Sequence, residues 1–301
     1  MSPLNIVDTF PAFLTCWALA QADPLERQIE RWASEYMAQW PELLAKLQAD
    51  YAGQGADWRQ IARERVFPFV QARLPAMAKA RKHLCRLSPA LYQRAQRTLA
   101  FDADITFVIY VGIGCGAGWA TTYQDRPAIL FGLENIAECG WSDADSIAGL
   151  LAHELGHLAH TAWRAQRALS DGDGPWWQLY CEGFATRCEQ VILGEGSWHE
   201  SSRTGDDSWL EWCQSRKGWL AAEFLRAVSA GEPVHRFFGS WYEMDGHSQS
   251  GYFLGHEIVK ELEAGGALRE IAMLDDIERH FRPILEALAG PGAARLRSDA
   301  T

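Results

Sequence analysis

The segment LLAHELGHLAH, residues 150–160, constrains the fold more than any other, because it places three histidines and a glutamate in an apolar run. Its leucines recur at helical spacing, and Ser142 or Asp143 can cap a helix leading into it. A buried helix has little reason to carry imidazoles and a carboxylate unless something pairs them. The segment is therefore either a core helix with satisfied histidines or the ligand helix of a metal site.

The spacing within this segment favours the metal site. His153 and His157 are four residues apart, so their Cβ atoms lie on one helical face about 5–6 Å apart. Two imidazoles so placed can bind one zinc ion at about 2.0–2.1 Å each. Glu154 is displaced by one residue, which is where a general base for a zinc-bound water belongs. His160 lies about 10 Å of helical rise from His153, so we expect it to pack or to support the ligands.

Composition limits the partners and the compartment. The chain has 301 residues, 48% of them hydrophobic, which is enough for a substantial core. Its formal charge of −11 argues against nucleic acid and anionic membranes as partners. No apolar run approaches the roughly 20 residues of a membrane-spanning helix. The seven cysteines include no C-x-x-C pair, which favours buried thiols over disulfides or a zinc ribbon.

The segment PAFLTCWALAQA, residues 11–22, has the short apolar core of a signal peptide. However, the ten residues before it contain no Lys or Arg and include Asp8, which is the wrong charge pattern for export. We therefore predict a cytoplasmic protein.

Local patterns predict an α+β fold, mostly helical, with a small antiparallel or mixed sheet beside the histidine helix. Residues 1–103 are expected to be helical, with prolines breaking the helix pattern after residue 66. β-branched and aromatic runs predict strands over 104–114 and 126–133, and residues 119–125 are a third candidate. Helical patterns return over 142–160, 175–193, 208–228 and 250–263. We expect one compact unit comprising a helical region (1–103), a catalytic region (104–290) and a flexible tail (291–301).

A catalytic zinc ion usually has three protein ligands and one open position. Pro175 suits the start of a second helix, and Glu182 lies about two turns inside it. The small Gly183 beside Glu182 would let two helices approach closely. We therefore expect Glu182 to be the third ligand. The alternatives are Asp171, Asp173 and Glu189.

HELGH, followed 25 residues after its second histidine by EGFA, resembles the gluzincin metallopeptidases, the thermolysin-like clan. The chain is also similar to bacterial zinc-dependent proteases known only as a domain of unknown function. That likeness spans about residues 104–262 and includes YVGIGCGAGWATTY, AILFGLENIAE and GYFLGHEIV. The resemblance implies a single zinc ion held by the two histidines of HELGH and by Glu182. Thermolysin-like enzymes carry an aspartate four residues later to orient a histidine. Here that position is Thr186, and Glu189 could serve instead.

A peptidase also needs a donor for the oxyanion that forms when water attacks the carbonyl. The segment GHSQSGYFLGHEIVKEL offers His247, Tyr252 and His256. Tyr252 and His256 are four residues apart, hence on one helical face. By resemblance, the tyrosine of this segment faces the zinc, so Tyr252 ranks before His256. The alternative is that both pack between helices.

GIGCGAG, residues 112–118, follows a predicted strand and leads into another rather than into a helix. It also lacks a Gly-Lys-Ser/Thr ending, so a glycine turn near an edge strand is favoured over a nucleotide site. Gluzincins use such a strand to hold an extended peptide by backbone hydrogen bonds. Cys115 is interpreted as incidental. The fourteen tryptophans are dispersed, which favours packing over a sugar-binding cleft.

The sequence thus predicts a single-zinc peptidase acting on a peptide or protein substrate. The assigned residues are His153, His157 and Glu182 as ligands, Glu154 as general base, and Tyr252 and His256 as oxyanion donors. One alternative is a zinc hydrolase of a non-peptide amide or ester. The other is a regulatory or binding protein whose zinc is structural, although a structural site has no need of the Glu154 carboxylate.

Overall fold

The computed structural model describes residues 3–200, 208–239 and 241–290. It is mostly helical with one four-stranded mixed sheet, which confirms the predicted α+β class. The chain divides into two compact units, Met1–Leu158 and Ala159–Thr301. None of the described helices is both long and apolar enough to cross a bilayer. The predicted tail, 291–301, lies outside the described residues.

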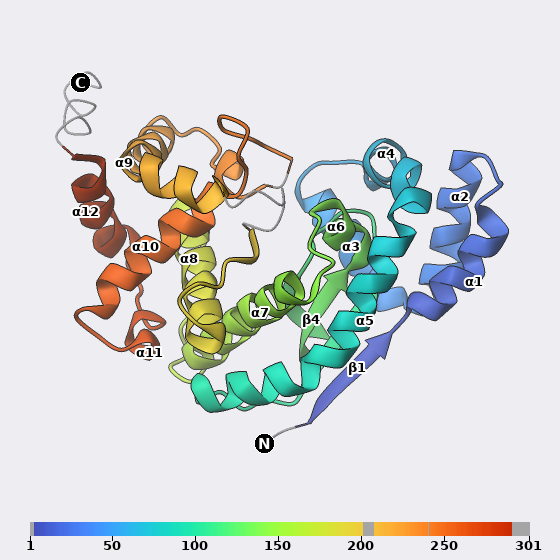
Figure 1. Ribbon diagram of the computed structural model, residues 1–301, viewed down its shortest axis with the longest axis horizontal. Helices are drawn as coiled ribbons and strands as arrows, with labels where there is room; N and C mark the ends of the chain where they lie inside the picture. The colour runs from blue at the N-terminus through green and yellow to red at the C-terminus, as the bar shows by residue number, and fades with distance from the viewer. Residues whose placement is uncertain (1–2, 201–207, 240, 291–301) are drawn as a thin grey trace. The chain divides into compact units, whose positions relative to one another are not determined.

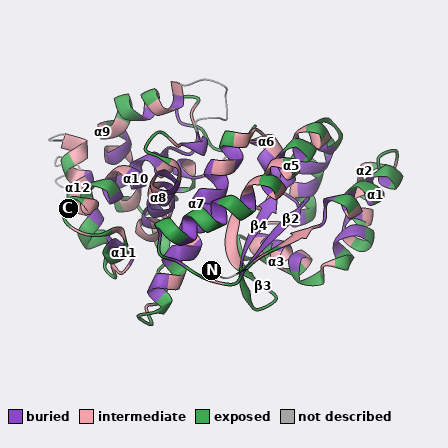
Figure 2. Cartoon of the chain, turned by 60° about the horizontal axis from the view of Figure 1, so that its bottom comes forward, coloured by how far each residue is buried: buried purple, intermediate pink, exposed green. Residues whose placement is uncertain are grey.

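The sheet belongs to the first unit and has the strand order β1-β2-β4-β3, of which β1 and β4 are labelled in Figure 1. β1, Leu4–Asp8, and β4, Arg126–Gly132, both run parallel to β2, Ile105–Tyr110. β3, Trp119–Tyr123, is antiparallel to β4 and forms one edge. β2 is buried along its whole length, as a central strand should be, whereas β3 is mostly half-buried (Figure 2). The sheet therefore has two short edge strands, β1 and β3, and most residues of each are half-buried.

β1 shows that the expectation of a wholly helical region over residues 1–103 was wrong. It pairs with β2 from Leu4 opposite Ile105 onward, so its partners lie far along the chain. A strand of five residues has too little periodicity of its own to be recognised locally. The signal-like segment that follows it forms α1, Phe10–Ala20, whose Phe13 and Trp17 side chains are buried in the core.

α5, Phe67–Thr98, shows that the expected proline breaks were also wrong, since the helix continues through Pro75 and Pro89. A proline inside a helix removes one backbone hydrogen bond and costs about 3 kcal/mol. Both prolines lie on the exposed face, where water can bind the carbonyl groups that lose their donors. Met77 and Leu84 are fully buried, and the burial of that side keeps the helix continuous.

The remaining α-helices of the first unit lie in regions that were expected to be helical, except α6, which was not predicted. They are α2 (Leu25–Arg31), α3 (Pro41–Gly53), α4 (Trp58–Ile61), α6 (Leu133–Glu138) and the first part of α7 (Ala144–Ala165). α3 begins at Pro41 as expected. α7 begins after Asp143, whose Oδ1 accepts a hydrogen bond of 3.0 Å from the Ser146 N–H. Asp143 is therefore the capping residue, and α7 continues across the division between the units.

The second unit is helical, and its helices up to residue 263 agree with the predicted ranges, whereas the two that follow were not predicted. They are the end of α7, α8 (Gly174–Leu193), α9 (Ser208–Ser229), α10 (Ser250–Glu263), α11 (Leu268–Ile271) and α12 (Ile277–Ala289). α8 and α10 cross in contact at two glycines. A Cβ added at Gly183 would lie 2.1 Å from the Gly255 carbonyl carbon, and one added at Gly255 would lie 2.3 Å from the Leu179 oxygen. Only glycine at both positions allows this approach.

We predict that Gly183→Ala lowers the free energy of unfolding by about 1–3 kcal/mol, because the new methyl group must push the two backbones apart. Gly265→Ala is the matched control, since its Cβ would meet its nearest neighbour, the Leu262 oxygen, at an ordinary 3.7 Å. Urea unfolding of both variants measures the difference. Equal stability of the two variants would show that the crossing is looser than described.

Candidate functional site

The two histidines of HELGH lie one turn apart on α7, in the first unit. Their Nε2 atoms are 3.1 Å apart, and His153 is buried while His157 is half-buried. Two ligands about 2.0–2.1 Å from a tetrahedral ion are separated by roughly 3.3 Å. The pair is thus spaced, as its position in the sequence predicts, to share one metal ion.

Glu154 is buried, and β3 holds its carboxylate. Its Oε2 accepts a hydrogen bond of 3.0 Å from the backbone N–H of Ala120. A Cβ added at Gly118 would lie 2.4 Å from Glu154 Oε1, so any larger residue there would displace the carboxylate. The glycine-rich segment therefore makes room for the predicted general base beside the edge strand.

The same segment binds a second carboxylate, that of Glu134 on α6. Glu134 Oε2 accepts from the Gly112 N–H at 2.6 Å, and Oε1 accepts from the Gly114 N–H at 3.0 Å. Burial raises the pKa of Glu134, and these two hydrogen bonds oppose the rise. Both amides are thus occupied from within the protein, which agrees with a glycine turn rather than a phosphate cradle. Burial likewise raises the pKa of the Cys115 thiol far above its usual range, so it is not an activated nucleophile.

His160 lies on the part of α7 that belongs to the second unit, in an aromatic cluster. Its Nε2 is 2.9 Å from the hydroxyl of Tyr180, and that hydroxyl donates to the Ile271 carbonyl at 2.7 Å. The Tyr180 and Phe184 rings lie about its imidazole, with centroids 5.0 and 4.9 Å away. These contacts join α7 to α8.

Glu182 lies on α8 between these two aromatic residues and is half-buried. Its backbone carbonyl accepts a hydrogen bond of 2.9 Å from the Thr186 hydroxyl. Of the alternative ligands, Asp171 has 62% of its side chain exposed and lies 3.8 Å from Arg164 Nε. Asp173 is exposed at the N-terminus of α8. Neither carboxylate is enclosed as a ligand of a buried ion would be.

Glu189, the fourth candidate ligand, belongs to a buried cluster that the sequence did not reveal. Its Oε2 lies 2.6 Å from Nδ1 of His199, and its Oε1 accepts from the Ser197 hydroxyl at 2.7 Å. Glu200 lies beside them, and burial raises its pKa to about 7. His199 and Glu200 follow a glycine turn and fit no periodic pattern, so no local signal marks them.

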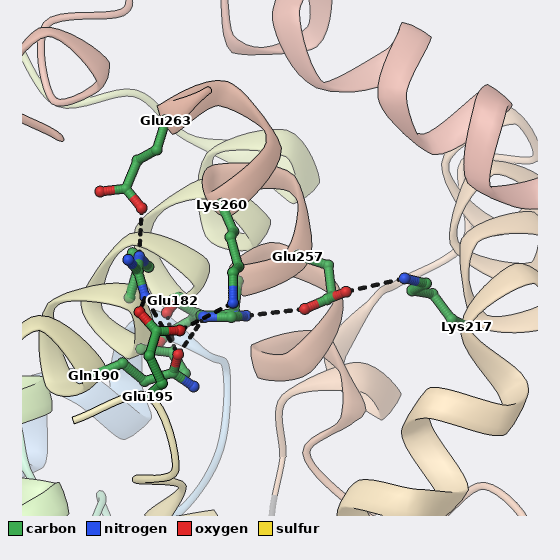
Figure 3. Close-up of polar contacts among 10 residues, drawn as sticks. Glu182, Gln190, Glu195, Lys217, Glu257, Lys260 and Glu263 are labelled. Atoms are coloured by element: carbon green, nitrogen blue, oxygen red, sulfur yellow. Dashed lines mark hydrogen bonds and ion pairs between the residues drawn. The ribbon is translucent and has the colours of Figure 1, made fainter. Parts of the chain in front are cut away.

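Tyr252 and His256 lie on α10, as predicted. Tyr252 is half-buried, with its ring 5.9 Å from that of Phe238. His256 is buried, and both ring nitrogens have partners, which are labelled in Figure 3: Nε2 is 2.8 Å from Gln190 Oε1, and Nδ1 is 3.2 Å from Glu257 Oε1. His256 thus links α8 to α10 within a polar network. The third residue of this segment, His247, stacks on Trp212 with centroids 4.5 Å apart.

Comparisons with known proteins provide no family for this chain. No family model matches it, and neither does any curated protein or solved structure.

The polar network around His256 predicts a pH dependence of stability. The hydrogen bond with His256 lowers the pKa of Glu257 to about 2, although burial opposes the shift, and Lys217 Nζ, 3.0 Å from Glu257 Oε2, lowers it further. The pKa of an unfolded glutamate is about 4.3. The folded value is the lower one, so this stabilisation is present above about pH 4.3 and is lost as the pH falls towards 2.

We therefore expect Glu257→Gln to destabilise the protein near neutral pH and to have a diminishing effect between about pH 4.5 and 2.5. Thermal unfolding of wild type and variant across this range measures the difference. Glu261→Gln, an exposed position on the same helix, is the control. A difference that does not change with pH would contradict the assigned ion pair.

Proposed function

We propose that this protein is a zinc-dependent peptidase of the gluzincin type. One observation carries the proposal: within the first unit, the paired Nε2 atoms of His153 and His157 lie on the same helix as a carboxylate held at an edge strand. Peptide hydrolysis by a metal-activated water needs three parts: a pair of metal ligands, a general base and a strand that can hold an extended peptide.

The donor set fits zinc. Two neutral imidazoles and one carboxylate are the ligands of several catalytic zinc sites, and they leave the fourth position open. We propose Glu182 as the carboxylate. It is half-buried, like His157, and it can offer one oxygen ligand.

The contacts of His160 support this choice of ligand. Within the second unit, His160 contacts Tyr180 and Phe184, the residues that flank Glu182. His157 precedes His160 on the same helix by about 4.5 Å of rise. The region of α8 around Glu182 therefore packs against the turn of α7 that directly follows His157.

Each assigned residue has a distinct task in the proposed reaction. When bound, zinc lowers the pKa of a water molecule and polarises the carbonyl group of the substrate. Glu154 takes a proton from the attacking water and passes it to the leaving amine. Tyr252 donates a hydrogen bond to the developing oxyanion. His256, whose ring nitrogens contact Gln190 and Glu257, positions α10 and its tyrosine rather than reaching the substrate itself.

The edge strand indicates the form of the substrate. β3 pairs with β4 along one side only, and on this strand the Ala120 N–H is directed to Glu154 rather than to β4. An extended peptide can add to such an edge by backbone hydrogen bonds. These bonds recognise the main chain of a peptide or protein substrate.

The central test of the proposal is Glu154→Gln. The amide keeps the size of the side chain and an oxygen to accept from Ala120, but it cannot take up a proton. We expect the zinc content to stay equal to that of wild type and peptide hydrolysis to fall at least about a hundredfold. Elemental analysis and a fluorogenic peptide library measure the two properties. Loss of zinc, or full activity, would disprove the role of Glu154 as general base.

The third ligand is tested by Glu182→Ala, with Asp171→Ala as the control for an alternative carboxylate. We expect the first variant to lose the zinc ion held by His153 and His157 after dialysis against a weak chelator, because two imidazoles alone bind the ion much less tightly. The second variant should bind zinc as wild type does. Zinc retained by Glu182→Ala would transfer the role of third ligand to another carboxylate.

A further inference from the structure

A cluster of three titratable side chains in the second unit has no part in the proposed reaction. Glu189, on α8, and His199 and Glu200, in the segment that follows this helix, are 0%, 4% and 1% exposed. Two carboxylates and one imidazole are therefore almost completely removed from water. Burial of an ionised carboxylate is costly unless hydrogen bonds or an opposite charge compensate it.

The two carboxylates differ in the hydrogen-bond donors that stabilise their negative charge. Glu189 accepts hydrogen bonds from the Ser197 hydroxyl, from the backbone N–H of His199 at 3.1 Å and from the His199 ring. Glu200 accepts none on either oxygen from any residue that the structure describes. Among the residues that the structure describes, its one ion-pair contact is His199 Nδ1, 3.6 Å away, which Glu189 already engages at 2.6 Å.

One protonated imidazole cannot neutralise two carboxylates, whereas one divalent cation can. Each of the three residues offers a ligand atom, and these atoms lie within 4.8 Å of one another. A first-row transition-metal ion accepts mixed imidazole and carboxylate donors, whereas magnesium and calcium prefer oxygen ligands throughout. The uncompensated oxygens of Glu200 are the ligands that such an ion would use.

We propose that Glu189, His199 and Glu200 form a second metal site, which binds a divalent transition-metal ion and has a structural role. The site joins a helix to the segment that follows it. Two of its ligands come after Gly194 and Gly196, where an added Cβ would meet no other atom within 4 Å, and the third is on α8. The ion would therefore fix residues 194–200 against α8. This inference does not depend on the proposed catalytic zinc.

The test is the metal content of the full chain after removal of metal and dialysis against Zn²⁺ or Mn²⁺ with a weak competing chelator. Four proteins are compared: wild type, His157→Ala, Glu200→Gln and the double variant. If both proposed sites exist, they bind two, one, one and no ions. If only the structural site exists, the numbers are one, one, none and none. If only the catalytic site exists, they are one, none, one and none, which overturns this proposal alone.

His157→Ala keeps the test decisive even if Glu200→Gln fails to fold, because it leaves the buried cluster intact. One ion bound to this variant supports the second site, and none overturns it. Glu243→Gln and His280→Ala, both exposed, measure adventitious binding to surface carboxylates and imidazoles. The structural role predicts that Zn²⁺ or Mn²⁺ slows hydrogen exchange of residues 194–200 in His157→Ala and has no such effect in the double variant. Equal exchange with and without metal in His157→Ala would disprove the structural role.

Discussion

Both units are organised around buried polar side chains on α7, which need hydrogen-bond partners to replace the water they lose. Four ionisable side chains of this helix are at most 6% exposed: His153, Glu154, His160 and Arg164. Each would destabilise the fold if it were left without partners. In the first unit the edge strand supplies an amide to Glu154. In the second, Tyr180 meets His160, and the carbonyls of Ser170, Ala272 and Leu274 accept from Arg164. The loops and helices that supply these partners are thereby fixed in place.

Glycines provide the space that these buried groups require. Gly118 leaves room for the Glu154 carboxylate, and Gly183 and Gly255 let α8 and α10 cross with their backbones in contact. The crossing also brings Gln190 on α8 within hydrogen-bond distance of His256 on α10. The glycines in EGFA and GYFLGHE thus have a packing reason that is independent of catalysis.

Local sequence patterns were sufficient to predict those features of the structure that depend on residues close together in the chain. The helix cap at Asp143, the paired histidines and the start of α8 near Pro175 all follow from short-range spacing. The strand β1 and the unbroken α5 did not follow, because each depends on packing against residues far along the chain. The cluster around Glu200 was missed for the same reason: its members come from a helix and from a turn without periodicity. Spacing within a helix can be read from sequence, whereas convergence of separate segments cannot.

The two buried glutamates on which the proposals depend differ in how their negative charge is stabilised. Glu154 accepts a hydrogen bond from a backbone amide, which stabilises the ionised form and leaves the group able to exchange a proton. Glu200 has no such donor among the described residues, so burial opposes its ionisation and only a cation or a proton can compensate it. A carboxylate held by an amide suits acid–base chemistry, whereas one that lacks donors suits a ligand. This contrast is the physical reason for proposing different tasks for two residues of the same chemical type.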